Sequence, residues 1–281
     1  MGGRPATYIQ YMKQNIHDVP LFYESYGTGT PIVLLHGSGG DHRSMMAWME
    51  PVFAQQPGWQ RIYLDLPGMG QTPGAEFIKS SDDTLALIVD FIDAVVHGQP
   101  FLLVGFSYGG YLSQAVLHRK FEQVAGMALI CPGVIMDPAQ RNVPPQRVLV
   151  ENPALLAGLD QTDAEEFAAR AVVQSQETWE RFRDEMLSGA RLTDQAFRAR
   201  LQHSCSFDVA ALPQPFPRPV LLLTGRQDHI AGYRNQWSLL ENYPRGTFAL
   251  LDRAGHLLPI EQPQLLNALI GEWLDRVREK L

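Results

Sequence analysis

The sequence has little cysteine and no long apolar run. Its 281 residues include two cysteines, Cys131 and Cys205, which are far apart and form no CxxC pair. This spacing excludes a zinc knuckle and a thioredoxin-like motif, and we expect two reduced thiols. No run of about 18 apolar residues occurs, so no transmembrane helix is expected. Residues 1–5 lack the apolar stretch of a signal peptide, and we therefore expect a soluble, cytoplasmic protein.

The sequence also has fewer basic residues than acidic ones. The chain has 23 lysines and arginines against 30 aspartates and glutamates, for a formal net charge of −7. Nucleic acids and anionic membranes attract clustered basic side chains, so neither is an expected partner. The chain has no H-x-x-H or H-x-H pair and no G-x-G-x-x-G after its first buried strand, so we expect neither a metal nor an organic cofactor. A small-molecule substrate is the expected partner, and the oligomeric state stays open.

Short continuous apolar runs predict strands that are covered on both faces. These runs lie at 32–35, 62–64, 101–104, 127–130 and 220–223. Between them, apolar residues with helical spacing predict a helix over 85–92, capped by Ser81 or Asp82, and further helices over 108–120 and 262–279. Residues 8–26 alternate apolar and polar side chains as an antiparallel hairpin does. Together these elements predict an α/β fold with a doubly wound, mostly parallel sheet.

The alternation of strand and helix stops between residues 134 and 216, and prolines mark both borders. Inside, the pattern predicts amphipathic helices: one from a capping box at 162–165, a second with Trp179, Phe182 and Met186 on one face, and a third over 193–203. We therefore predict a core domain made of 1–133 and 217–281, with a helical cap inserted at 134–216.

A G-x-S-x-G stretch at 105–109 is the strongest local pattern. It stands directly after the predicted strand 101–104 and directly before a predicted helix. A serine at such a tight turn has unfavourable backbone dihedrals, and the flanking glycines let neighbouring backbone come close. The turn lifts the hydroxyl above the sheet, beside a helix N-terminus that offers a backbone N–H to an oxyanion. Ser107 is therefore the predicted nucleophile; the alternative is a glycine-rich turn that contains a serine by chance.

A serine hydroxyl needs a base, and the base needs a carboxylate that fixes its tautomer. His256 lies in a glycine-containing loop after a strand-like segment, and loops after parallel strands meet at the edge where Ser107 lies. His229 competes for this role from the loop after strand 220–224. Asp228, in that same loop, is the predicted acid. Asp137, after strand 127–131, is its rival.

Five motifs together resemble the α/β-hydrolase superfamily. They are His36-Gly37-Ser38-Gly39, the D-x-P-G-x-G turn at 65–70, the elbow at 105–109, the G-x-x-D loop at 225–228 and Gly255-His256. The order Ser, Asp, His is that of the α/β-hydrolases. The resemblance covers the whole chain except the insertion, which falls where that family carries its helical cap. The aspartate of the D-x-P-G-x-G turn, Asp65, is expected to be structural.

The resemblance implies an oxyanion hole made by the backbone N–H groups of Ser38 and Tyr108, with His36 shaping the loop. It also implies hydrolysis of a carboxylic ester or related acyl compound through an acyl-serine intermediate. Haloalkane dehalogenases and epoxide hydrolases resemble this fold but use an aspartate where this chain has Ser107. Two alternatives stay open: a carbon–carbon bond hydrolase acting on ring-fission products, and a ligand receptor or sensor of the same fold.

Apolar side chains near the expected site predict a small to medium, largely apolar and uncharged substrate. Phe106 flanks the nucleophile, and the cap contributes Trp179, Phe182 and Met186. The alternative for the cap aromatics is that they form the packing core of the cap itself.

Overall fold

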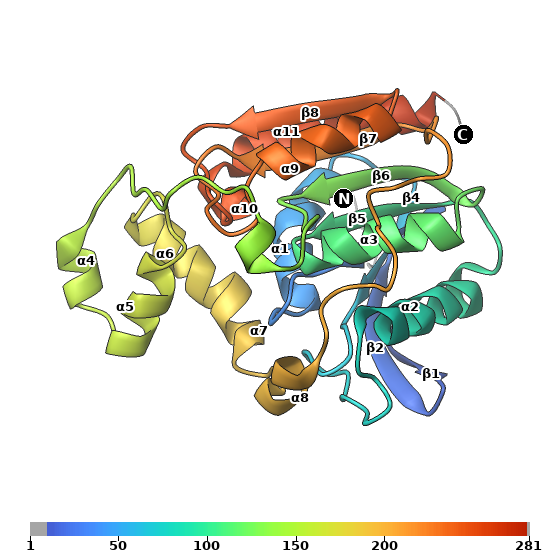
Figure 1. The fold of residues 1–281 in the computed structure, drawn as a ribbon, viewed down its shortest axis with the longest axis horizontal. Helices are drawn as coiled ribbons and strands as arrows, with labels where there is room; N and C mark the ends of the chain where they lie inside the picture. The colour runs from blue at the N-terminus through green and yellow to red at the C-terminus, as the bar shows by residue number, and fades with distance from the viewer. Residues whose placement is uncertain (1–9, 280–281) are drawn as a thin grey trace, which may run out of the picture.

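One eight-stranded sheet forms the centre of the computed structural model, which describes residues 10–279 (Figure 1). Residues 1–5 and the first two residues of the predicted hairpin lie outside the described residues. The strands follow the order β1-β2-β4-β3-β5-β6-β7-β8 across the sheet. Their bounds are β1 (Gln10–Ile16), β2 (Val19–Tyr26), β3 (Thr30–Leu35), β4 (Trp59–Leu64), β5 (Phe101–Phe106), β6 (Val124–Ile130), β7 (Val220–Gly225) and β8 (Gly246–Leu251).

Strands β3 to β8 pair in parallel, whereas β2 pairs antiparallel with both β1 and β4. The β1–β2 turn places His17 and Asp18 at positive φ, 48° and 64°, which suits a two-residue hairpin turn. The mostly parallel sheet and the hairpin predicted from the sequence are thus confirmed. Because parallel strands run in one direction, their carboxyl ends share one edge of the sheet, and the loops there can meet.

Helices cover both faces of the sheet. They are α1 (His42–Phe53), α2 (Ser81–Val96), α3 (Tyr108–Arg119), α9 (Arg234–Trp237), α10 (Leu258–Glu261) and α11 (Pro263–Arg278). Alternate residues of β3 show the two layers: Val33 and Leu35 pack in the cluster that contains the α2 and α3 side chains, while Ile32 and Leu34 pack with α1 and α11. This alternation explains why the strand is apolar throughout.

The N-cap of α2 lies one residue before the first of the two predicted caps. Ser80 is the cap, with its hydroxyl accepting from the Asp83 N–H and the Asp83 carboxylate accepting in return from the Ser80 N–H. Ser81, proposed as the cap, is instead the first helical residue. Its hydroxyl is bonded to the phenol of Tyr108 at 2.8 Å, so it serves tertiary packing.

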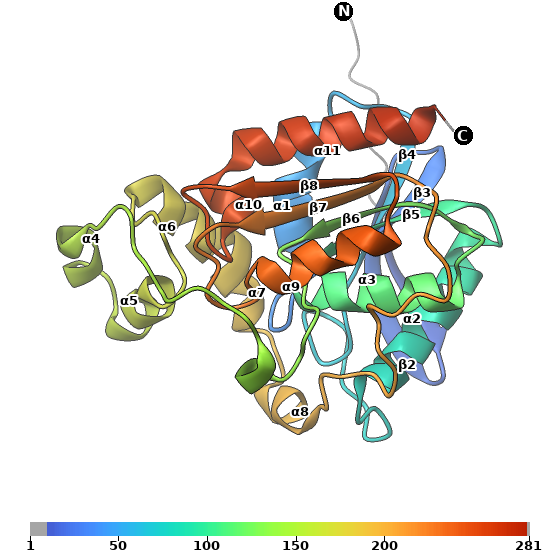
Figure 2. The same cartoon turned by 45° about the horizontal axis from the view of Figure 1, so that its top comes forward.

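Residues 134–216 contain short helices and isolated bridges, and no strand of the sheet comes from them. The helices are α4 (Pro153–Ala157), α5 (Gln161–Ala168), α6 (Gln176–Phe182), α7 (Ser188–Ala190) and α8 (Gln195–Arg200), with a π-helical turn at Arg183–Leu187 between α6 and α7. Figure 2 shows α4, α5 and α6 projecting away from the sheet. None of the helices in the described part of the chain is long and apolar enough to cross a membrane.

Two predictions about these helices are wrong in detail. The carboxylate of Asp160, not the hydroxyl of Thr162, caps α5, because it accepts from the Thr162 N–H at 3.0 Å. The helix predicted over 193–203 is limited to α8. Asp194 caps that helix by accepting from the Phe197 N–H, and Leu201 already has extended dihedrals.

Candidate active site

Ser107 lies at the turn between β5 and α3, with φ at +53°. The glycines on either side are required by close backbone contacts. A Cβ on Gly105 would lie 2.4 Å from the Gly109 carbonyl oxygen, and one on Gly109 would lie 2.1 Å from that of Leu35. The sequence therefore holds the serine in a strained conformation at the carboxyl edge of the sheet.

Three side chains from three different strand ends meet at this edge. The Ser107 Oγ lies 2.9 Å from His256 Nε2, and His256 Nδ1 lies 3.0 Å from Asp228 Oδ2. The second carboxylate oxygen of Asp228 accepts from the N–H groups of Ile230 and Ala231, at 2.9 Å each. The structure thus brings together the predicted nucleophile, base and acid, which are up to 149 residues apart in sequence.

The surroundings of Asp228 favour its ionised form. Burial by itself raises the pKa of this carboxyl, but the charge of His256 and the hydrogen bonds from His256, Ala231 and Ile230 outweigh burial and lower it. An ionised Asp228 accepts a hydrogen bond from a protonated Nδ1 of His256. The lone pair of the neutral imidazole is then on Nε2, which faces the serine hydroxyl. This is the tautomer that a general base needs.

The rival residues lie elsewhere. Asp137 is exposed, and its carboxylate accepts from the N–H of Ala139 in a short 3₁₀ turn, Pro138–Gln140. His229 makes no hydrogen bond to Ser107 or Asp228, and it lines a separate depression with Thr162. Neither residue joins the relay that the structure forms.

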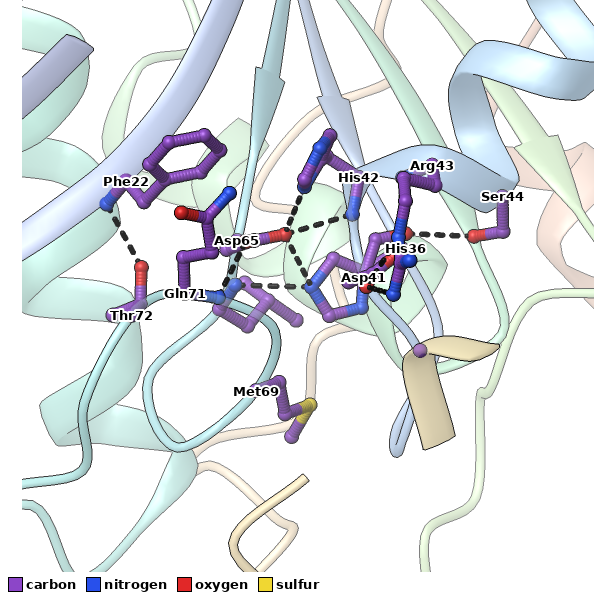
Figure 3. Close-up of polar contacts among 12 residues, drawn as sticks. Phe22, His36, Asp41, His42, Arg43, Ser44, Asp65, Met69, Gln71 and Thr72 are labelled. Carbon is purple, nitrogen blue, oxygen red and sulfur yellow. Dashed lines mark hydrogen bonds and ion pairs between the residues drawn. The ribbon is translucent and has the colours of Figure 1, made fainter. Parts of the chain in front are cut away.

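A buried polar network supports the loop after β3 (Figure 3). His36 accepts from the Leu66 N–H at Nε2 and donates from Nδ1 to the Gly37 carbonyl. Asp65 accepts from the backbone N–H and the Nδ1 of His42, at 2.7 and 2.8 Å, and from the Gln71 N–H at 2.8 Å. Burial lowers the pKa of His36, which favours its neutral form, and its hydrogen bonds are structural. The structure thus gives His36 and Asp65 contacts that fix loops.

The same loop runs past the nucleophile. A Cβ on Gly37 would lie 3.2 Å from Ser107 Cβ, so the backbone leading into Ser38 is next to the Ser107 side chain. Tyr108 follows the serine as the first residue of α3. Burial raises the pKa of its phenol to about 12, and its hydroxyl is bonded to Ser81. The phenol of Tyr108 is thus engaged with Ser81, and its backbone N–H is the group that the sequence prediction assigns to the oxyanion hole.

A cavity of about 600 Å³ opens at Ser107 and His256. It is also lined by Ser38, Tyr108, Arg141, Arg170, Arg198 and His203. The four basic residues in this set, three arginines and His203, belong to no motif. They were not predicted as site residues, because single basic residues in the 134–216 segment have no distinctive spacing. The walls are not apolar throughout, because guanidinium groups stand beside apolar residues such as Met136 and Ile230.

A second cavity of about 380 Å³ shares Ser38, Arg170 and Arg198 with the first. Three of the predicted substrate-binding residues, Phe106, Phe182 and Met186, line this second cavity. Trp179 lines neither. Its ring packs against Phe167 and Phe182, with centroids 5.4 and 6.2 Å apart. For Trp179 the structure favours the alternative interpretation, that it belongs to the packing core of the cap.

Comparisons with known proteins agree with this geometry. A family profile described as "Alpha/beta hydrolase family" matches residues 32–269. A pimeloyl-acyl-carrier-protein methyl ester esterase of Shewanella woodyi is 25% identical and spans 91% of this chain and 98% of its own. The AB hydrolase superfamily protein YisY of Bacillus subtilis is 25% identical over 94% and 98% of the two chains.

Among solved structures, an alpha/beta superfamily hydrolase from Oenococcus oeni PSU-1 is similar with a TM-score of 0.86 and 29% identity. That match covers 95% of this chain and 98% of the other. The fold, the profile match and these similarities agree with the resemblance drawn from the five motifs. The chain belongs to the alpha/beta hydrolase family.

Proposed function

We propose that this protein is a serine hydrolase that cleaves a small to medium carboxylic ester or related acyl compound through an acyl-serine intermediate. The observation that carries the proposal is the continuous relay from Ser107 to His256 to Asp228, with contacts of 2.9 and 3.0 Å, at the floor of a cavity. A cavity of about 600 Å³ is of the size that binds a small organic molecule.

The chemistry follows from the positions of the protons. His256 Nε2 takes the hydroxyl proton of Ser107 while the oxygen attacks the ester carbonyl, and Asp228 stabilises the imidazolium that forms. Backbone N–H groups of Ser38 and Tyr108 would bind the negative oxygen of the tetrahedral intermediate. The imidazolium then protonates the leaving alcohol. Water, activated by the same imidazole, hydrolyses the acyl-serine and restores the enzyme.

The curated relatives support an ester as the substrate class. The Shewanella woodyi relative is named as a methyl ester esterase, and it aligns over nearly the whole of both chains. Its ester is one in which a small alcohol leaves, a reaction that the proposed relay can perform without a metal ion.

The test is hydrolysis of p-nitrophenyl butyrate together with labelling by a fluorophosphonate. We expect the wild-type protein to show both, with the label on the peptide that contains Ser107. Ser107→Ala should lose labelling and about 10⁴-fold or more in kcat, because members of a triad act as a unit. Ser188→Ala is the matched control, since that exposed hydroxyl donates only to the Asp184 carbonyl. Labelling that persists in Ser107→Ala contradicts the proposal.

A further inference from the structure

The cavity at Ser107 has a charge opposite to that of the whole protein. The chain carries a formal net charge of −7, yet three arginines and no aspartate or glutamate line this cavity. The arginines come from three separate parts of the 134–216 segment, at positions 141, 170 and 198. A local excess of guanidinium groups in an acidic protein is an attractive site for an anion.

The three arginines differ in how their charge is matched. Arg170 forms an ion pair with Glu166, one turn earlier in α5, so its charge is largely balanced. Arg141 and Arg198 have no carboxylate within ion-pair distance in the described part of the chain. A ligand anion would therefore meet two guanidinium groups without counter-ions.

Arg141 is held by backbone carbonyls. Its Nε donates to Ile135 at 2.8 Å, its Nη2 to Met136 at 2.7 Å and its Nη1 to Ile230 at 3.1 Å. A guanidinium has five N–H groups, so two remain, one on each terminal nitrogen. Burial lowers the pKa of Arg141 despite the opposing effect of Asp228 and Asp137, as expected for a cation that lacks a close anionic partner. The carbonyls fix its orientation and leave its charge unmatched.

Arg198 lines the same cavity from helix α8. Among the described residues, its guanidinium makes one hydrogen bond, from Nε to the Ser38 hydroxyl, at 3.2 Å. Helix α8 is anchored by the preceding residue, Phe197, whose ring packs against Gly68 and Gly74. Because the helix is docked on the core in this way, Arg198 is held beside the oxyanion loop.

A fourth basic side chain, His203, lines the same cavity. His203 Nε2 is buried without a hydrogen-bond partner in the described residues. Its ring packs edge-on against Tyr108, with centroids 5.2 Å apart. The imidazole therefore adds a polar ring to the wall that also holds the three guanidinium groups.

We propose, resting on the hydrolase function above, that the substrate is an acyl compound with a second, anionic end, a carboxylate bound by Arg141 and Arg198 while its ester carbonyl lies at Ser107. The half ester of a dicarboxylic acid has this chemistry. Planar guanidinium groups pair with a carboxylate through two parallel hydrogen bonds. Phosphate would suit the same groups, so inorganic phosphate is included in the test.

Calorimetric titration of Ser107→Ala measures binding without turnover. The ligands are monomethyl succinate, glutarate and adipate, each compared with the methyl ester amide in which the carboxylate is replaced by a carboxamide. We expect at least one half ester to bind about 10- to 100-fold more tightly than its amide, because hydrogen bonds to charged groups are the stronger ones. Higher salt should reduce this preference.

Variants in the same background locate the site. Arg198→Gln and Arg141→Gln should each reduce the ratio of acid to amide affinity by about tenfold or more. Arg183→Gln, which removes an exposed cap arginine paired with Asp184, has the same change in net charge and should keep the ratio. Arg198→Gln keeps the test valid if the loop around Arg141 does not tolerate substitution.

The outcomes separate the two proposals. Equal binding of acids and amides, or tight binding of inorganic phosphate without binding of any half ester, overturns the carboxylate site whatever the hydrolase assay shows. Loss of the acid preference in Arg183→Gln as well would also overturn it, because the effect would then come from net charge. Failure of Ser107 labelling, by contrast, refutes the hydrolase function and leaves the binding measurement to stand by itself.

Discussion

Glu261, in α10, offers the sharpest single test of how the 134–216 segment and the proposed active site are joined. One carboxylate oxygen accepts from the N–H groups of Val172 and Val173, at 2.6 and 3.2 Å. The other accepts from the N–H of Gly255, at 2.7 Å, next to His256. One side chain thus ties the segment after α5 to the loop that carries the proposed base.

Glu261→Ala removes all three hydrogen bonds at once. An unsatisfied buried N–H costs about 1–3 kcal/mol, so three of them predict a loss of about 3 kcal/mol or more in the free energy of unfolding. Glu261→Gln keeps one oxygen and should cost clearly less. Urea denaturation followed by fluorescence measures both. Esterase activity should fall more in the alanine variant, because the loop that holds His256 loses its anchor.

The pH dependence follows from the pKa of Glu261, which burial raises from 4.5 to about 7 against the lowering effect of the Gly255, Val172 and Val173 N–H groups. The folded protein therefore holds this proton more tightly than the unfolded chain does. The stability that Glu261 contributes is present below its unfolded pKa and declines as pH rises through about 7. Glutamine does not titrate, so the wild-type advantage over Glu261→Gln should shrink between pH 5 and pH 8.

Glu165→Gln is the matched control, because that exposed glutamate interacts only with the side chain of Gln161, one turn earlier in α5. It should change stability by less than about 0.5 kcal/mol at either pH. If Glu261→Ala unfolds at the wild-type urea concentration, the three N–H groups find other partners and the anchoring role is wrong. A constant difference between wild type and Glu261→Gln from pH 5 to pH 8 would contradict the assigned pKa shift.

Three further predictions concern the relay and the packing of α8 against Gly68. Asp228→Asn should lower kcat about 10⁴-fold by favouring the wrong imidazole tautomer, whereas Asp137→Asn should change kcat little; the reverse result would move the acid to the other loop. His256→Ala should abolish activity on an activated ester, since the serine proton then has no acceptor, whereas His229→Ala should keep it; an active His256→Ala variant speaks against this base. Gly68→Ala should lower the melting temperature, because its Cβ would lie 2.2 Å from the Phe197 ring and its φ is +72°; an unchanged melting temperature would show that α8 shifts freely.

Local sequence determined the sheet and the positions of the reacting groups. The apolar runs that became β3 to β7 are buried on both faces, so their residue types follow directly from their surroundings. Ser107, Asp228 and His256 each follow a strand at a turn with its own glycine pattern, and parallel strands bring those turns to one edge. The reason is backbone geometry. Glycine is needed wherever an added Cβ would collide with another chain segment, so the turn at 105–109 can be recognised from the sequence.

The tertiary structure alone decided what surrounds the serine. Trp179 faces inward in the cap because Phe167 and Phe182 pack beside it, and no periodicity distinguishes that side of a short helix from a ligand-facing side. Arg141 and Arg198 are 57 positions apart by their numbers and share no motif. They line one cavity because carbonyls hold the first and the docking of Phe197 holds the second. The charge of a site formed by long-range packing is not encoded in any local pattern, and only the folded chain shows it.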